Sequence, residues 1–212
     1  MASAERGLRA SELECVRGLR RLFQGLSFSV GPGDMLWVLG ANGSGKTSLL
    51  RLLCGLARPE SGVVSWNGRD VRQSRDAFNA DLLYAGHAPA IKDDLTALEN
   101  LRFGLAQSGI TATQARAQTA LTQFGLDASG GVMARALSQG QRRRVGLARL
   151  ALAASKPLWI LDEPFTALDR EATQLVQTHL EAQLQRGGSV VFTSHQEVDF
   201  GATRVTRLAL AA

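Results

Sequence analysis

A glycine-rich segment of eight residues, GANGSGKT at positions 40–47, is the part of this sequence most suited to chemistry. It matches the pattern GxxxxGK[ST], in which successive backbone N–H groups and a lysine surround phosphate oxygens. An apolar run at 35–39 precedes it and an amphipathic run at 47–54 follows it, as the strand and helix of this pattern should. The predicted nucleotide-binding residues are Gly40, Ala41, Asn42, Gly43, Ser44, Gly45, Lys46, Thr47 and Ser48.

Two adjacent carboxylates form the second candidate group. Asp162 and Glu163 follow an apolar run at 158–161. Lys46 would bridge the β- and γ-phosphates, while Thr47 and Asp162 would hold Mg²⁺ or one of its waters. Glu163, one residue further on, would polarise the attacking water as a general base. Adjacent carboxylates can also be a solvated turn, but the presence of the lysine segment in the same chain favours the catalytic interpretation.

Several runs of residues must position these groups. The runs at 35–39, 158–161 and 190–193, apolar except for the final Thr193, are typical of central strands covered on both faces. Alternating runs at 13–17, 26–30 and 63–66, the last followed by Asn67-Gly68, predict an antiparallel start. Apolar residues at three- and four-residue spacing predict helices at 96–107, 111–124 and 139–154. The sequence therefore predicts a helical block inserted into an α/β core.

Composition limits the location and partners of the chain. No apolar run approaches the roughly 20 residues of a membrane span. Residues 1–10 contain charges of both signs and no apolar segment typical of a secretory signal, so we expect a cytoplasmic protein. Cys15 and Cys54 lack the spacing of a zinc site, and we expect both to be buried and free. The net charge of +5 is compatible with nucleic acid, lipid headgroups or nucleotides and does not choose among them.

A third motif identifies the family. The segment Leu137, Ser138, Gln139, Gly140 and Gln141 resembles the LSGGQ signature of the ATP-binding cassette (ABC) transporter ATPases, with Gln139 in place of the first glycine. The alternative is an ordinary basic helix capped by Ser138. Asp169 stands where the family has its D-loop, and His195, after the run at 190–193, where it has its switch histidine. The resemblance extends over about residues 13–208, and we identify the chain as a member of this family.

The resemblance implies an α/β fold, namely a P-loop NTPase of the ABC ATPase type. Its mixed-sheet core would have an antiparallel N-terminal subdomain and an inserted helical subdomain. Residues 1–212 would form one ABC ATP-binding domain, with the core at about 1–90 and 156–212 and the helical subdomain at about 91–155. The cofactors would be ATP and Mg²⁺, and Glu163, His195 and Lys46 the catalytic residues. In a head-to-tail homodimer, residues 137–141 would act on the ATP held by the other subunit.

The sequence departs from the family at two positions. The Q-loop, at 84–89, has His87 and no glutamine, so His87 is the candidate for that role. The aromatic side chain that usually stacks on adenine is missing before Phe23, where residues 19–22 read Leu-Arg-Arg-Leu. We expect Phe23 to be a core residue, which leaves Arg20 and Arg21 as candidates for stacking on the base.

Within the family the chain is most similar to the CcmA family, the ATPase subunits of the cytochrome c maturation system, often called the heme exporter. The similarity lies at 84–89, 95–101, 159–167 and 194–196. It implies a CcmB-type integral membrane subunit as partner, with CcmC and the heme chaperone CcmE in the system. The chain would lie peripherally on the cytoplasmic face of the inner membrane. Hydrolysis of ATP would drive release of the heme-loaded chaperone or export of heme.

Other functions remain open at this point. The chain could be the ATPase subunit of another ABC importer or exporter. A soluble ABC ATPase acting on nucleic acid or ribosomes usually has a coiled-coil arm or a second cassette. Here about 90 residues separate Lys46 from Ser138 and no second GxxxxGK[ST] occurs, so we expect no nucleic-acid partner. A regulatory module that binds nucleotide without hydrolysis is a further alternative. No CxxCH motif occurs, so we expect no direct heme binding.

Overall fold

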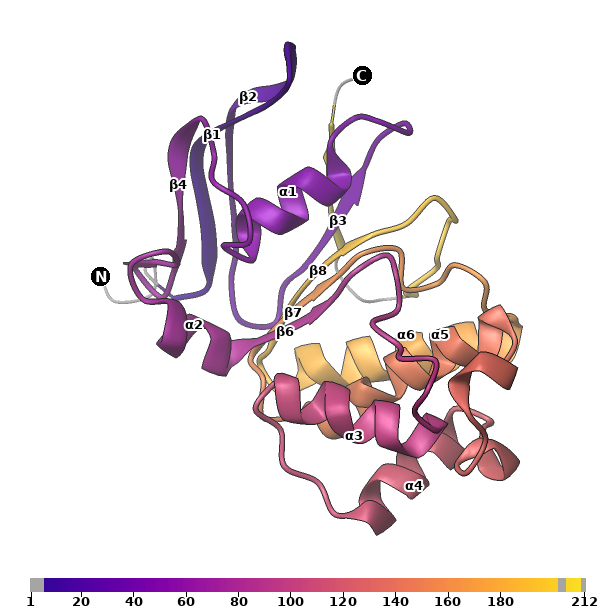
Figure 1. Ribbon diagram of the computed structural model, residues 1–212. Helices are drawn as coiled ribbons and strands as arrows, with labels where there is room; N and C mark the ends of the chain where they lie inside the picture. The colour runs from indigo at the N-terminus through magenta and orange to yellow at the C-terminus, as the bar shows by residue number, and fades with distance from the viewer. Residues whose placement is uncertain (1–5, 202–204, 211–212) are drawn as a thin grey trace.

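The computed structural model describes residues 6–201 and 205–210, which form two sheets and a group of helices (Figure 1). One sheet has the strand order β2-β1-β4-β5 and the other the order β6-β7-β8-β3-β9. Residues 1–5, 202–204 and 211–212 lie outside the described residues. The predicted domain at 1–212 and the segment at 1–10, in which no secretory signal is expected, therefore extend beyond the described residues.

The first sheet is antiparallel, as predicted. Its strands are β1 (Leu8–Arg17), β2 (Arg20–Val30), β4 (Ser61–Trp66) and β5 (Arg69–Asp70). The turn between β4 and β5 is made by Asn67 and Gly68, both with positive φ, at 50° and 77°. Because these two residue types tolerate left-handed backbone, the Asn-Gly signal was sufficient to predict the hairpin.

The second sheet is parallel throughout and carries the candidate site. Its predicted strands are β3 (Met35–Leu39), β7 (Leu158–Leu161) and β8 (Ser189–Thr193), whose residues are nearly all buried. Two more strands, β6 (Leu82–Ala85) and β9 (Val205–Ala209), were not expected from the sequence. Parallel strands end at one edge of the sheet, so the loops after β3, β6, β7 and β8 lie together.

A hydrophobic layer joins the two sheets. Helix α1 (Lys46–Leu53) lies between them (Figure 1), and its Leu49, Leu50 and Leu53 belong to one core cluster with Leu13 of β1 and Val38 of β3. Phe23 packs against this cluster and Cys54 belongs to it; Cys15 is also buried, and both thiols are free. The expectation for the two cysteines is confirmed, whereas Phe23 is only partly buried, and its ring also lies beside Gly45 of the glycine-rich segment. Helix α2 (Arg75–Asp81) leads from the first sheet into β6.

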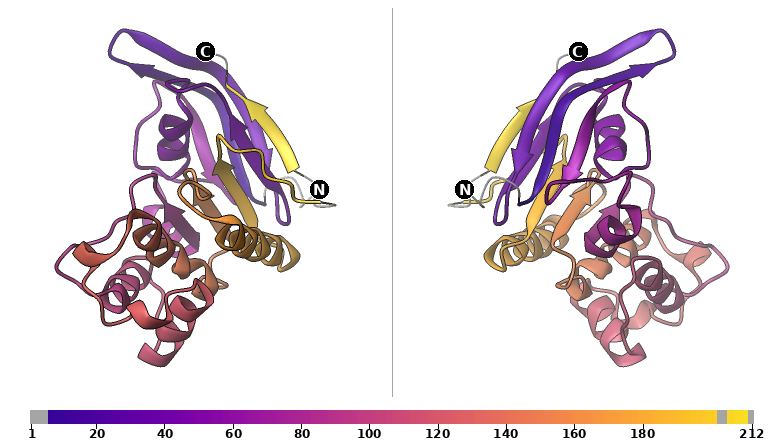
Figure 2. Two further views of the ribbon diagram at one scale, coloured as in Figure 1. Left: turned by 90° about the vertical axis from the view of Figure 1, so that its right-hand side faces the viewer. Right: turned by 90° about the vertical axis from the view of Figure 1, so that its left-hand side faces the viewer.

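The other face of the parallel sheet is covered by helices. These are α3 (Ala97–Gln107), α4 (Gln114–Gln123), α5 (Gln139–Leu147) and α6 (Arg170–Gln185), with 3-10 turns η1 (Asp127–Ser129) and η2 (Ala134–Ala136). In Figures 1 and 2, α3, α4 and α5 gather on the side away from the antiparallel sheet. Their core is continuous with that of the parallel sheet. The domain boundaries near residues 91 and 155 stay a prediction.

The helix expected at 139–154 was too long. It ends at Leu147, and the chain continues as a 3-10 helix, η3 (Ala148–Leu152). Helix α6 was missed, although its buried residues Ala172, Val176, Leu180 and Leu184 recur every four positions. Within the described ranges 6–201 and 205–210, no helix is long and apolar enough to cross a bilayer.

A partly buried histidine, His179, predicts how stability depends on pH. The His179 ring stacks on Phe124, with centroids 5.6 Å apart, and its Nε2 atom has no hydrogen-bond partner. Burial, and then the nearby Arg186, lower the pKa of His179. The unfolded chain therefore binds more protons below the unfolded pKa near 6.5, so the free energy of unfolding should fall with acidification below about pH 6.5. Urea titrations should show this slope weakened in His179→Phe and retained in Thr178→Ala.

Candidate functional site

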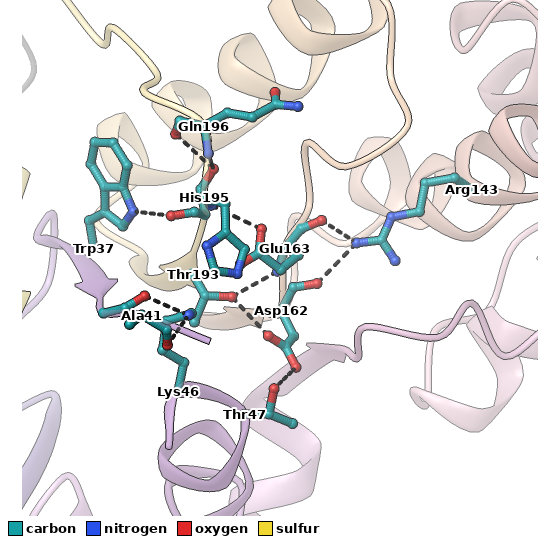
Figure 3. A network of polar contacts seen from close by, with 12 residues as sticks. Trp37, Ala41, Lys46, Thr47, Arg143, Asp162, Glu163, Thr193, His195 and Gln196 are labelled. Atoms are coloured by element: carbon teal, nitrogen blue, oxygen red, sulfur yellow. Dashed lines mark hydrogen bonds and ion pairs between the residues drawn. The ribbon is translucent and has the colours of Figure 1, made fainter. Parts of the chain in front are cut away.

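The glycine-rich segment forms a tight loop between β3 and α1. Gly45 caps α1 with a left-handed backbone, at φ 101°, and a Cβ atom there would lie 3.1 Å from Leu22 Cβ. The Lys46 side chain curls back over the loop, and Nζ donates to the carbonyl oxygens of Gly40 at 2.7 Å and Ala41 at 3.1 Å (Figure 3). Ser44 Oγ is buried without a hydrogen-bond partner. The loop thus presents a cation, a free hydroxyl and a helix N-terminus in one place, as phosphate binding requires.

Asp162 connects three elements at the carboxyl edge of the sheet. Its Oδ2 accepts a hydrogen bond from Thr47 Oγ1 of α1 at 2.9 Å. Its Oδ1 accepts one from Thr193 Oγ1 of β8 at 2.8 Å, and the same hydroxyl oxygen accepts from the Glu163 backbone N–H at 2.8 Å. Thr193 was not predicted from the sequence. The available signal was a polar residue at the end of an otherwise apolar strand.

Glu163 follows Asp162 in a left-handed conformation, with φ 53°. One carboxylate oxygen, Oε2, accepts from the His195 backbone N–H at 3.1 Å, and Oε1 lies 3.3 Å from His195 Nε2. The carboxylate is largely buried, whereas half of the His195 side chain is exposed. A non-glycine residue with positive φ costs energy, which the surrounding contacts must offset. The structure brings the predicted pair together, with the Glu163 carboxylate turned toward His195 (Figure 3).

A cavity of about 520 Å³ joins these groups. The residues that line it include Asn42, Gly43, Gly45, Lys46, Thr47, Ser48, His87, Asp162, Glu163 and His195. His87 therefore faces the same space as Lys46 and Glu163, although 41 positions separate it from Lys46 in the sequence. The loops after four parallel strands supply this lining, which is where α/β proteins bind nucleotides.

The arginine that lines the cavity is not one of the two that were expected to stack on the nucleotide base. Arg17, at the end of β1, and Leu22 line the cavity beside the phosphate loop. Arg21 instead forms an ion pair with Glu14 at 2.8 Å and is not among the lining residues. Arg20 lies near Gly43. Arg17 was not considered from the sequence, because the turn between β1 and β2 sets which arginine faces the loop.

The signature segment lies at the N-terminus of α5, away from this cavity. Ser138 caps the helix: its hydroxyl accepts from the Gln141 N–H at 3.2 Å, and the Gln141 side chain accepts from the Ser138 N–H at 2.9 Å. None of the residues 137–141 lines the cavity of the same chain. Asp169 caps α6 and forms an ion pair with Arg144 of α5. The signature helix and the D-loop residue are thus held together on the surface.

The residues at the loop fit a hard divalent cation. Such ions prefer oxygen ligands, and Mg²⁺ usually takes few protein ligands together with phosphate oxygens. Thr47 Oγ1 donates its proton to Asp162, so the hydroxyl oxygen keeps lone pairs for a cation. Among the described residues no cluster of three or more His, Cys, Asp or Glu could hold a metal on its own.

Comparison with known proteins agrees with this geometry. Residues 23–166 match the family model described as ABC transporter. The chain therefore belongs to the ABC transporter family. The matched range contains the phosphate loop, the signature segment, Asp162 and Glu163.

Relatives define the branch of the family. The chain is 52% identical over 204 residues to the cytochrome c biogenesis ATP-binding export protein CcmA of Nitrosomonas europaea, covering 96% of this chain and 95% of the relative. It is also 52% identical to the protein of the same name from Aromatoleum aromaticum, over 91% of this chain and 90% of the relative. The chain is thus a member of the CcmA group, and it is an ATP-hydrolysing subunit of the ABC type.

Solved structures confirm the fold. An ATP-binding subunit of an ABC transporter superimposes with a TM-score of 0.79 at 24% identity, over 89% of this chain and 79% of the other. A dimeric ATP-binding cassette in a post-hydrolysis state, bound to ADP and Pi, gives a TM-score of 0.78 at 23% identity, over 97% of each chain. The predicted fold class is therefore confirmed.

Proposed function

We propose that this chain is the ATPase subunit of a transporter for cytochrome c maturation and that it hydrolyses MgATP at the cavity described above. The single observation that carries the catalytic part is the convergence of Lys46, Thr47, Asp162, Glu163 and His195 on one cavity. The names of the relatives support the biological role.

The chemistry follows from the positions of the side chains. The phosphate loop and Lys46 would bind the β- and γ-phosphates, and Thr47 with Asp162 would hold Mg²⁺, which would neutralise phosphate charge. Glu163 accepts the proton of the attacking water as general base. The His195 N–H holds Glu163 Oε2, and the half-exposed imidazole is free to contact the γ-phosphate of a bound nucleotide. His87 takes the place of the Q-loop glutamine because it lines the same cavity.

Two copies of the chain complete the site. The signature residues 137–141 lie outside the cavity of their own chain, and a capped helix N-terminus is suited to contact a phosphate. In a head-to-tail homodimer, Ser138 and Gly140 of one copy would approach the ATP held by the other copy. The described dimeric cassette is a related fold in which two such chains assemble.

Arg17 is the proposed platform for the nucleotide base. A planar guanidinium stacks on aromatic rings, and such contacts contribute about 0.5–2 kcal/mol. Arg17→Ala should therefore weaken ATP binding by roughly 2- to 30-fold, and Arg17→Tyr should restore affinity. Isothermal titration calorimetry measures the ATP affinity of the two variants, each made in the Glu163→Gln background. Arg21→Ala is the matched control because Arg21 pairs with Glu14; equal losses in the two alanine variants would contradict the assignment.

The biological role has its own partners. We propose a CcmB-type membrane subunit, with CcmC and CcmE in the same system, and a peripheral location on the cytoplasmic face of the inner membrane. Neither nucleic acid nor heme is a proposed ligand of this chain. The loop after β6 is a suitable contact for the membrane subunit, because Asp94 is exposed and Lys92 lies over the Phe103 ring at 5.0 Å.

A pull-down tests this role. The tagged Glu163→Gln chain should recover, from detergent-solubilised native membranes with ATP and Mg²⁺, an integral membrane subunit together with heme-handling maturation proteins. Mass spectrometry identifies them. Recovery of a permease with a binding protein, or of ribosomes or DNA, would leave the ATPase chemistry in place and contradict the maturation role.

A further inference from the structure

Three consecutive arginines at the start of α5 contact three different segments. Arg142 pairs with Asp93 at 2.7 Å, in the loop after β6. Arg144 pairs with Asp169 at the start of α6. Arg143, between them, is 6% exposed and has no carboxylate within ion-pair distance among the described residues. Arg142 and Arg144 therefore make ordinary ion pairs, whereas Arg143 is a buried cation with no carboxylate partner among the described residues.

The Arg143 guanidinium is surrounded by backbone carbonyl oxygens. One terminal nitrogen, Nη1, donates to Gly86 O at 3.2 Å and to His87 O at 2.9 Å. The other, Nη2, donates to Asp162 O at 3.0 Å and also to Glu163 O (Figure 3). Each terminal nitrogen thus serves one segment, and the planar fork joins two segments that are 76 positions apart, from His87 to Glu163.

The Arg143 contact lies at the point where the pairing of β6 with β7 ends. The β6–β7 ladder has its last register pair at Ala85 and Leu161, and one more hydrogen bond joins Asp162 N to Ala85 O. Beyond that point the two strands no longer pair, and the Arg143 side chain bridges the gap between them. It fixes the peptide groups of His87 and Glu163, two residues whose side chains line the cavity.

We propose that Arg143 is a positioning residue for ATP hydrolysis, which holds the Glu163 carboxylate and the His87 loop in register with the signature helix. This inference rests on the proposed role of Glu163. Glu163 has a left-handed backbone, and its carbonyl group is held by Arg143 while its N–H donates to Thr193 Oγ1. Any rotation of α5 is therefore transmitted to the peptide that carries the general base.

The same contacts distinguish Arg143 from a packing residue. A packing residue would need only its aliphatic stem, which methionine can replace. A lysine would keep the charge, but its single ammonium group cannot serve both segments in the geometry of the fork. Since Glu163 acts only on the hydrolytic step, its displacement should lower kcat and leave ATP affinity nearly unchanged.

The test uses the complex recovered with the tagged chain, in which ATP turnover and ATP affinity are measured for Arg143→Met and Arg143→Lys. Arg116→Met, an exposed arginine on α4, is the matched control. We expect kcat to fall roughly 10- to 100-fold in Arg143→Met, less in Arg143→Lys, and less than about twofold in Arg116→Met, with ATP affinity within about threefold throughout. Thermal unfolding reports the folded fraction. If Arg143→Met does not fold, Arg143→Lys carries the test, with the same split between kcat and affinity.

A double variant separates this inference from the proposed function. Adding Arg143→Met to Glu163→Gln should leave the residual rate unchanged, because both substitutions act through one group. Full turnover by Glu163→Gln alone would contradict the proposed function. Two results would overturn only the role of Arg143. One is a normal kcat in folded Arg143→Met while Glu163→Gln loses turnover. The other is a further loss in the double variant that equals the loss in Arg143→Met alone.

Discussion

Glu163→Gln should abolish turnover while the chain still binds ATP. The substitution keeps the shape of the side chain and removes the base, and general-base catalysis contributes typically about 10²–10⁴-fold to a rate. We therefore expect kcat to fall by roughly that factor, with ATP affinity within a few fold of the unsubstituted chain. Phosphate release from the complex measures the first quantity and titration calorimetry the second.

The control for this variant is Glu197→Gln, because Glu197 is an exposed carboxylate on the loop after β8 and does not line the nucleotide cavity. Its turnover should match that of the unsubstituted chain. Full turnover by Glu163→Gln would instead assign the base to another group, and a parallel loss of ATP binding would indicate a structural defect.

Lys46→Ala should weaken nucleotide binding itself. Lys46 Nζ donates to two carbonyl oxygens of the phosphate loop, and the side chain is buried at its base. A hydrogen bond to a charged group contributes about 1.5–3 kcal/mol, so the dissociation constant for ATP should rise roughly 10- to 150-fold.

Lys92→Ala removes a lysine that lies over the Phe103 ring, outside the cavity, and serves as the matched control. Equilibrium dialysis with ATP and Mg²⁺ should give this variant the affinity of the unsubstituted chain. Unchanged affinity in Lys46→Ala would count against the phosphate contact of Lys46.

The parts of the site that could be predicted are continuous segments of a few residues. Residues 40–47 form a continuous motif, and Asp162 with Glu163 directly follows a strand whose apolar character is unmistakable. In such motifs the chemistry and the backbone conformation depend on neighbouring residues, so the pattern alone is informative. Local signals also predicted the Asn67-Gly68 hairpin and the Ser138 cap.

The parts that could not be predicted depend on tertiary contacts. Thr193 contacts Asp162, 31 positions away, and Arg143 contacts Gly86, 57 positions away. Neither contact can therefore be recognised from the pattern of neighbouring residues. Arg17 faces the cavity because of the twist and turn of β1 and β2, which composition does not fix. The short strand β6 overlaps residues 84–89, which were assigned to the Q-loop from the sequence, and it was therefore missed.

The assembly of two chains around shared ATP is the central claim, and sedimentation velocity of Glu163→Gln tests it most directly. With saturating MgATP, the account predicts a stable dimer, which dissociates to monomer when ATP is replaced by ADP. Adding Ser138→Arg places a bulky side chain at the start of α5 and should keep the protein monomeric in MgATP. A Glu163→Gln chain that remains monomeric in MgATP, or that dimerises equally well with Ser138→Arg, would contradict the head-to-tail site.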